Sequence, residues 1–136
     1  MGIFVSDDDN SHIINGSDGN IFIFNKDDTL LGNGGDDTIF AGSGNDSIDG
    51  GGGSDSIFGG TGDDTINGGF VADIIFGGDG NDLITFKAGE FFDSVDGGTG
   101  NDTLDATGAT TTGTYNFQAG TITGFGIGTG IGRAHV

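Results

Sequence analysis

Residues 50–58 read GGGGSDSIF, and residues 59–67, which follow without a gap, read GGTGDDTIN. Both fit a nonapeptide G-G-x-G-x-D-x-U-x, in which U is an aliphatic residue. The six Gly-rich residues favour a sharp turn through backbone conformations with positive φ. The last three residues can form a short strand whose aliphatic side chain lies on one face. One such unit can bury its single aliphatic side chain only against copies of itself, so the pattern predicts a solenoid.

The same unit recurs along most of the chain. Asp returns every nine residues, with one interval of eleven, and an aliphatic residue follows two positions after each Asp. The last position of the unit alternates, because Phe40, Phe58 and Phe76 return every eighteen residues. Two units per turn would place these three Phe residues on one sheet and the polar residues between them on another. The sequence therefore predicts an all-β fold, a right-handed parallel β-roll with two sheets and two nonapeptides per turn.

The regular repeat divides the chain into three parts. Residues 32–105 are predicted to form the β-roll. Residues 1–31 are interpreted as degenerate turns that form an N-terminal cap, with Ile13 in the aliphatic place of an early unit and Asp28 and Leu30 in the Asp and aliphatic places of a later one. Residues 106–136 are interpreted as a C-terminal cap segment followed by a Gly-rich tail, with a strand expected near residues 114–117.

Composition excludes several classes of function. The 136 residues include 32 Gly, 21 acidic residues and only 3 Lys or Arg, which gives a formal net charge of −18. Such a charge argues against nucleic acid and anionic membranes as partners. No run approaches the roughly 20 apolar residues of a membrane-spanning helix, so no membrane insertion is expected, and no N-terminal signal segment is visible. The absence of Cys excludes a disulfide scaffold and a thiolate zinc site.

The repeated carboxylates point to a metal. With two units per turn, the loops stack in two columns with rungs roughly 4.8 Å apart. Stacked carboxylates repel one another unless a cation lies between them, and Ca²⁺ accepts about 6 to 8 oxygen ligands from carboxylates and carbonyls. Mg²⁺ requires tighter octahedral geometry, and Zn²⁺ prefers His or Cys. Several Ca²⁺ ions are therefore predicted along two columns, which are Asp28, Asp46, Asp64, Asp82 and Asp102, and Asp37, Asp55, Asp73 and Asp93.

Residues 32–85 resemble the RTX, or hemolysin-type, calcium-binding repeat family, and weaker units extend the resemblance to about residues 15–105. The resemblance implies a parallel β-roll in which the Asp of each loop and several loop carbonyls bind Ca²⁺ between loops stacked on one side. It implies side-chain ligands at Asp28, Asp37, Asp46, Asp55, Asp64, Asp82 and Asp102. It implies backbone ligands in the loops at Gly32, Gly34, Gly42, Gly44, Gly51, Gly53, Gly60, Gly62, Gly78, Gly80, Gly98 and Gly100.

Two units depart from the pattern in the same column. Val71 replaces the fourth Gly before Asp73, and Phe91 replaces it before Asp93. A Cβ at a position that needs positive φ costs roughly 1 to 2 kcal/mol and can turn a carbonyl away from a metal. Calcium ligation by Asp73 and Asp93 is therefore in doubt, whereas the column of Asp46, Asp64, Asp82 and Asp102 is expected to be fully loaded.

An outward apolar face is also expected. Phe40, Phe58 and Phe76, joined by Ile74 on the same sheet, would form an aromatic ladder on a very acidic surface. Either the segment 114–125 folds back over this ladder, or the ladder docks another domain or another copy of the chain. The open strand edges at the ends of a solenoid could also pair end to end into a filament.

The sequence thus predicts a calcium-binding structural module that folds outside the cell, where calcium is plentiful. The resemblance implies that it belongs to a bacterial protein exported by type I secretion. No enzymatic activity is expected, because acid–base catalysis needs carboxylates in different environments and the repeat makes them alike. One alternative is a self-assembling subunit of an extracellular filament or surface layer. Ice binding is another, which the irregular occupants of the third position disfavour.

Overall fold

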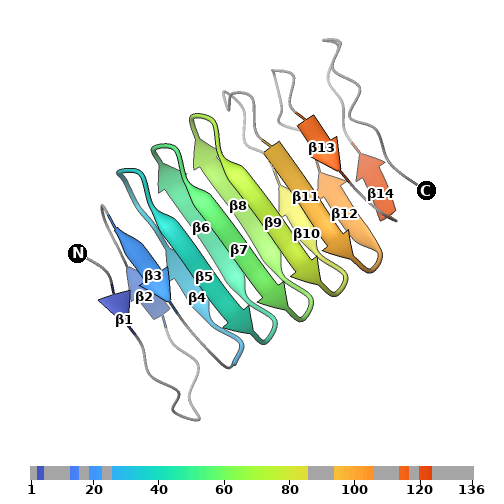
Figure 1. The fold of residues 1–136 in the computed structure, drawn as a ribbon, viewed down its shortest axis with the longest axis horizontal. Coiled ribbons are helices and arrows are strands. Elements are labelled where there is room, and N and C mark those ends of the chain that lie inside the picture. The colour runs from blue at the N-terminus through green and yellow to red at the C-terminus, as the bar shows by residue number, and fades with distance from the viewer. Residues whose placement is uncertain are drawn as a thin grey trace.

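The computed structural model describes residues 3–4, 13–15, 19–22, 26–85, 94–105, 114–116 and 120–123, with side chains described at residues 19, 26–85 and 94–105. Within this part of the chain, the regular secondary structure consists of strands, which form two seven-stranded sheets with parallel pairing throughout (Figure 1). The described residues contain no helix long and apolar enough to cross a membrane.

Successive strands alternate between the two sheets. The odd-strand sheet contains, in spatial order, β1 (Ile3–Phe4), β3 (Asn20–Phe22), β5 (Thr38–Ser43), β7 (Ser56–Thr61), β9 (Ile74–Asp79), β11 (Ser94–Thr99) and β13 (Thr114–Asn116). The even-strand sheet contains β2 (Ile13–Asn15), β4 (Thr29–Leu31), β6 (Ser47–Gly52), β8 (Thr65–Phe70), β10 (Leu83–Thr85), β12 (Asp102–Asp105) and β14 (Gly120–Thr123). The chain therefore winds as a solenoid, with one strand in each sheet per turn.

The register confirms that two nonapeptides make one turn. Ile39 pairs with Ile57, and Ile57 pairs with Ile75, so the aliphatic position of one unit lies beside that of the second unit after it. The one interval of eleven residues, between Asp82 and Asp93, does not shift this register. Val95, which follows it, still pairs with Ile75. The predicted two-sheet parallel β-roll is confirmed.

A narrow apolar core lies between the two sheets. Its aliphatic side chains alternate with outward residues along each strand, and each is at most 2% exposed. Each turn contributes two of them, one from each sheet, so the core is one side chain wide in each sheet and grows only by adding turns. The members of this ladder are Leu30, Ile39, Ile48, Ile57, Ile66, Ile75, Ile84, Val95 and Leu104.

The strands at both ends of the chain continue the two sheets in register. Ile14, and not Ile13 as predicted, lies beside Leu30 in the aliphatic place, because the pairing of β2 with β4 is set by Thr29 opposite Ile13. At the other end, β13 pairs with β11 and β14 pairs with β12. The capping role of the terminal segments stays a prediction. The proposed boundaries of the β-roll, after residues 31 and 105, also stay predictions.

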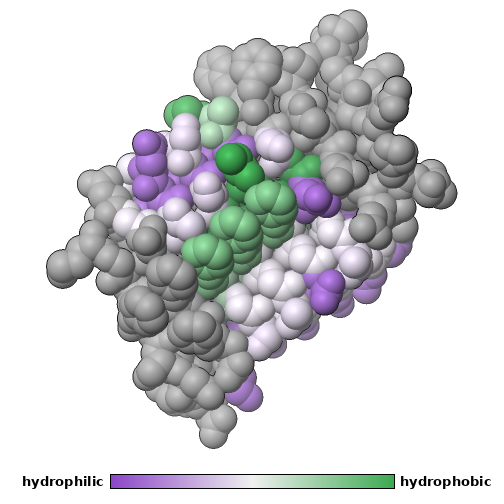
Figure 2. All heavy atoms as spheres, viewed as in Figure 1, coloured by the Kyte–Doolittle hydropathy of each residue, from purple (hydrophilic) through white to green (hydrophobic). Residues whose placement is uncertain are grey.

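Three Phe side chains stack on the outer face of the odd-strand sheet. The ring centroids of Phe40 and Phe58 lie 4.6 Å apart and those of Phe58 and Phe76 lie 5.1 Å apart, with interplanar angles of 6° and 7°. We call these three residues the Phe stripe, which Figure 2 shows in green between paler and purple surfaces. In the backbone register of the same sheet, Phe22 pairs with Phe40 and Phe4 pairs with Phe22.

The Phe stripe is not covered by the strands that follow the repeat. Phe76 is 40% exposed, and Ile74 beside it on β9 is 45% exposed. Of the two alternatives, the one in which residues 114–125 fold back over the stripe does not hold for β13 and β14, because both strands pair their backbone groups by extending the sheets at the C-terminal end. Phe117 and Phe125 lie outside the described residues.

Candidate metal centre

The sixth residue of each unit is a buried Asp at an edge of the solenoid. Asp46, Asp64, Asp82 and Asp102 lie on one edge with Asp28, while Asp37, Asp55 and Asp73 lie on the opposite edge. All eight are at most 3% exposed. Asp93 lies outside the described residues. Burial of so many carboxylates is costly unless hydrogen bonds or cations compensate for the lost water.

In seven of these carboxylates, one oxygen accepts a backbone hydrogen bond from the neighbouring turn. Oδ1 of Asp64 accepts the backbone N–H of Asp46 at 2.8 Å, and Oδ1 of Asp82 accepts that of Asp64 at 2.9 Å. The same bond repeats from Asp28 to Asp46 and from Asp82 to Asp102. On the opposite edge it joins Asp37 to Asp55 and Asp55 to Asp73. These bonds tie every described loop to the next one through the residue predicted to bind calcium.

The second carboxylate oxygen, Oδ2, is buried beside backbone carbonyl oxygens, which are hydrogen-bond acceptors like itself. Oδ2 has no hydrogen-bond partner in Asp37, Asp46, Asp55, Asp64, Asp82 and Asp102. A Cβ added to Gly59 would lie 2.5 Å from both Oδ2 of Asp64 and the carbonyl oxygen of Gly77. A Cβ on Gly77 would likewise meet Oδ2 of Asp82 and the carbonyl oxygen of Gly97. Two oxygens from adjacent turns thus converge on one point beside the first Gly of the unit.

This convergence is the geometry that a cation requires. Buried acceptors without donors are rare in folded proteins and call for an explanation, such as an ion. The donor set consists only of carboxylate and carbonyl oxygens, which suits Ca²⁺ and not Zn²⁺. No cluster of three or more His, Cys, Asp or Glu side chains suited to a metal occurs among the described residues. Backbone carbonyls would therefore have to supply much of the coordination.

Burial raises the pKa values of these carboxyl groups. Loss of water raises the pKa of Asp46 to about 7, although the N–H of Asp28 partly offsets the effect and the charge of Asp64 adds to it. Burial also raises the pKa values of Asp55, Asp64 and Asp82 to about 6. The pKa of Asp102 is raised for the same main reason. Without a cation, the ionised column is thus unfavourable in the folded state, and a divalent ion would reverse that effect.

A second ladder of side chains runs along the first edge, at the fifth position of the unit. Oδ1 of Asn45 accepts the N–H of Asp63 at 2.8 Å, and Oδ1 of Asp63 accepts the N–H of Asn81 at 2.8 Å. Asp27 and Asn81 make the equivalent bonds to Asn45 and Asn101. The carboxylate ladder accepts from the preceding turn and this one accepts from the following turn, so the two hold each loop from both sides.

This second ladder was not predicted from the sequence. In the described part of the opposite edge, Asp36 alone makes the bond, to the N–H of Ser54, and Ala72 one turn after Ser54 has no side-chain acceptor. The signal was the occupancy of the fifth position, which is always Asp or Asn on the first edge: Asp27, Asn45, Asp63, Asn81 and Asn101. A comparison of the fifth positions along each edge, and not along successive units, would have indicated that the first edge is the more regular of the two.

Loop glycines adopt positive φ at the second and fourth positions of the unit. Gly60 and Gly62 have φ of 114° and 125°, and Val71 at a fourth position has φ of 81°. Val71 therefore carries the strain that its Cβ was expected to cause, although Asp73 after it remains buried. Whether Asp73 binds calcium stays a prediction. Positive φ is shared by Gly42, Gly44, Gly51, Gly53, Gly78, Gly80, Gly98 and Gly100.

In the unit that begins at Gly32, the predicted backbone ligands Gly32 and Gly34 are the first and third residues. Positive φ occurs there at Asn33, with 72°, and at Gly35, with 102°. These two residues, and not Gly32 and Gly34, therefore occupy the places of Gly42 and Gly44 in the next unit. Gly32 instead lies beside Oδ2 of Asp37, where a Cβ would come within 3.0 Å of that oxygen.

Comparison with known proteins gives one match. The profile of the RTX calcium-binding nonapeptide repeat, which holds four copies of the unit, matches residues 24–57, 49–84 and 85–109. Searches among curated proteins and among solved structures gave no match. The matched residues include every Asp of the two edges described above.

Proposed function

Because the chain belongs to the RTX calcium-binding nonapeptide repeat family, we propose that it is a structural module that folds when it binds Ca²⁺. The observation that carries the proposal is the set of buried Oδ2 atoms that have no hydrogen-bond partner. Those of Asp37, Asp55, Asp64 and Asp82 lie near a carbonyl oxygen of the adjacent turn. Binding free energy of a metal becomes folding free energy when the site exists only in the folded chain.

The two edges would hold the ions. On the first edge, Oδ2 of Asp46, Asp64, Asp82 and Asp102 would supply charge, with Asp28 at its N-terminal end. On the opposite edge the corresponding groups are Asp37 and Asp55, followed by the doubtful Asp73 and Asp93. Loop carbonyls would complete each coordination shell, because positive φ at two positions per unit turns the backbone sharply there. Calcium would supply charge neutralisation and cross-linking of adjacent turns.

The proposed setting is outside the cell. RTX repeats are typical of secreted bacterial proteins, and type I secretion would export the chain unfolded. A net charge of −18 opposes compaction where calcium is scarce, and abundant calcium would then allow folding after export. The family is a structural calcium-binding repeat and not a catalytic one, and we propose that this chain is no enzyme.

Self-association is a second candidate function. It is favoured by the Phe stripe, whose member Phe76 is 40% exposed beside Ile74, and by sheets that reach both ends of the described chain. An extracellular filament or surface layer would use either the stripe or the open strand edges. The molecular mass measured by light scattering at saturating Ca²⁺ distinguishes association through the Phe stripe from association through the strand edges. A mass above the monomer that falls in Phe58→Ser supports the stripe, and one that survives this change supports end-to-end stacking. A monomeric mass excludes both.

Isothermal titration calorimetry of the whole chain tests the calcium proposal. Titration with Ca²⁺ should give binding of several ions with a large heat from coupled folding. The same titration with Mg²⁺ should give little heat, because Mg²⁺ demands octahedral geometry and keeps its waters. Absence of Ca²⁺ binding, or equal responses to the two ions, would contradict the proposal.

A further inference from the structure

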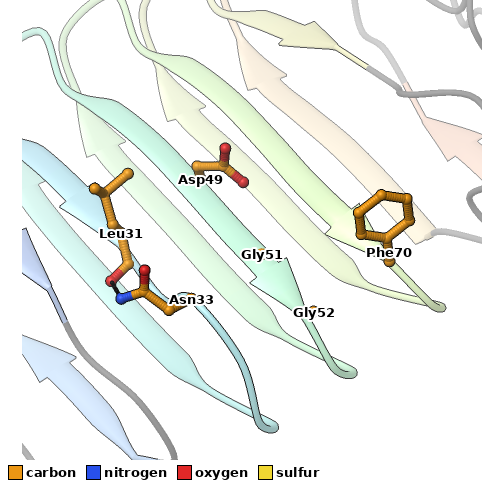
Figure 3. A pocket seen from close by; sticks show the side chains of 6 residues that line it. All are labelled: Leu31, Asn33, Asp49, Gly51, Gly52 and Phe70. Atoms are coloured by element: carbon orange, nitrogen blue, oxygen red, sulfur yellow. Dashed lines mark hydrogen bonds between the residues drawn. The ribbon is translucent and has the colours of Figure 1, made fainter.

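A groove crosses the outer face of the even-strand sheet, on the side away from the core. Its volume is about 420 Å³, and it spans three successive turns of β4, β6 and β8 (Figure 3). The lining residues are Leu31, Asn33, Asp49, Gly51, Gly52 and Phe70. None of the buried Asp residues of the two edges lines it, although Gly51 belongs to a loop for which backbone calcium ligands are proposed, so the groove borders the proposed calcium sites.

The floor of the groove contains a glycine that the fold does not require. A Cβ on Gly52 would have Asn33 O at 3.8 Å as its nearest neighbour, and Gly52 is not among the residues with positive φ. The same holds for Gly34, whose nearest neighbour would be Gly52 O at 3.8 Å. By contrast, Gly51 has φ of 100° and is held close to Asn33. The absence of side chains at Gly34 and Gly52 is thus a choice of residue in this sequence and is not required by the solenoid geometry.

Other turns confirm that this position accepts side chains. Gly34 and Gly52 are third residues of their units, and the third position of the other described units holds Ser43, Thr61, Phe70, Asp79 and Thr99. A side chain at Gly52 would project over the floor and fill the groove. Its absence from two adjacent turns of one column keeps the groove open.

An aromatic ring forms the wall at one end. Phe70 pairs with Gly52 across the sheet and is 55% exposed, the largest exposure among the large apolar side chains described. Asn33 and Leu31 lie on the other side of β6, with the Asp49 carboxylate between them and Phe70 along the sheet (Figure 3). Two strand spacings, roughly 10 Å, separate β4 from β8. This distance leaves room for one ring between the two walls.

The lining chemistry matches a hydroxylated ring. A pyranose has an apolar C–H face that can lie against Phe70, and hydroxyl groups that can donate to the Asp49 carboxylate and exchange hydrogen bonds with the Asn33 amide. The volume falls within the usual range of small-molecule sites. A net charge of −18 disfavours anionic ligands. We propose that this groove binds a neutral saccharide unit, which would give the module a recognition function besides its calcium-dependent structure.

Saturation-transfer difference NMR on the whole chain at saturating Ca²⁺ tests this site. The probes are cellobiose, maltose, lactose and N,N′-diacetylchitobiose, with agmatine as a cationic comparison. At least one disaccharide should give transfer from the wild type, and the signal should fall at least fivefold in Gly52→Thr and in Phe70→Ser. Ser43→Thr, which enlarges the third position on the other sheet, should leave the signal unchanged. Circular dichroism of each variant confirms that the calcium-bound fold is retained.

Three outcomes would overturn the proposal. No transfer to any disaccharide, or transfer that persists in both groove variants, would remove the site. Transfer to agmatine alone would make the groove an amine site and not a saccharide site. If Gly52→Thr fails to fold, Phe70→Ser decides alone, because it changes only an exposed side chain.

Discussion

The backbone N–H of Asp46 donates to Oδ1 of Asp64 at 2.8 Å, across one full turn of the solenoid. The same carboxylate has its Oδ2 buried without a hydrogen-bond partner, close to the carbonyl oxygen of Gly77 in the next turn. One oxygen therefore cross-links the turns without metal, and the other needs a cation. This division of roles explains how a chain with 21 acidic residues and a core one side chain wide can still form a regular stack.

Asp64→Asn separates these two roles. The amide oxygen can still accept the N–H of Asp46, while the new NH₂ can donate to the carbonyl of Gly77 in place of a cation. We expect calcium affinity to fall at least tenfold, because a charged ligand is lost, while folding without calcium becomes easier. Calorimetry and circular dichroism in chelator measure the two effects. Asp79→Asn removes the same charge from the exposed last residue of β9 and should change neither; equal effects in both variants would contradict the account.

Val71→Gly should stabilise the calcium-bound fold. Val71 has φ of 81° and is 46% exposed, so Gly relieves backbone strain while little buried surface is lost. We expect a gain of about 1 kcal/mol, seen as a rise of several degrees in the thermal unfolding midpoint at saturating Ca²⁺. Val71→Ala keeps the Cβ and should give no such gain. A lower midpoint for Val71→Gly would show that the strain is not stored at this residue.

The second ladder should contribute stability on one edge only. Asn45→Ala and Asn81→Ala each remove an acceptor for the N–H of the following turn, at Asp63 and Asn101. Each is expected to cost about 0.5 to 1.5 kcal/mol in the free energy of unfolding, measured with denaturant at fixed Ca²⁺. Ser54→Ala is the matched control on the opposite edge and should cost less. Equal losses at all three positions would contradict the asymmetry between the edges.

Acid should replace calcium in part. The unfolded chain has Asp pKa values near 3.8, whereas burial raises those of Asp55, Asp64 and Asp82 to about 6 and that of Asp46 to about 7. Because the pKa values are higher in the folded state, protonation of these carboxyl groups stabilises the fold. This stabilisation is complete below pH 3.8 and is lost as the pH rises through 6 to 7. In chelator, β structure should therefore increase as the pH falls from 7.5 to 4. Calcium affinity should decrease over the same interval, and a metal-free chain that loses structure on acidification would contradict this.

Much of the architecture follows from the spacing of residues along the sequence. The eighteen-residue return of Phe40, Phe58 and Phe76 predicts two units per turn, and the interval between Asp residues predicts two edges. These predictions hold because a solenoid translates sequence period directly into position. The register of irregular turns was harder to predict. Ile14, and not Ile13, pairs with Leu30, and the sequence alone does not decide between two adjacent Ile residues.

The details of the site depended on contacts between turns. Sequence indicates which carboxylates stack, but not that Oδ1 accepts an N–H from the preceding turn while the fifth position accepts from the following one. The sequence already places Asn33 and Gly35 four and two residues before Asp37, but it does not show that Asn33 adopts the positive φ of a Gly there. The groove at Gly52 depends on three strands from separate units, and no single unit shows it.

The most direct test of the central claim is far-UV circular dichroism of the whole chain, first in chelator at pH 7.5 and then during titration with Ca²⁺. The account predicts a coil spectrum in chelator and a cooperative gain of β structure on adding Ca²⁺, with no comparable change on adding Mg²⁺. A chain that already shows its full β spectrum in chelator would contradict the claim, because the Ile and Phe ladders would then stabilise the fold without calcium.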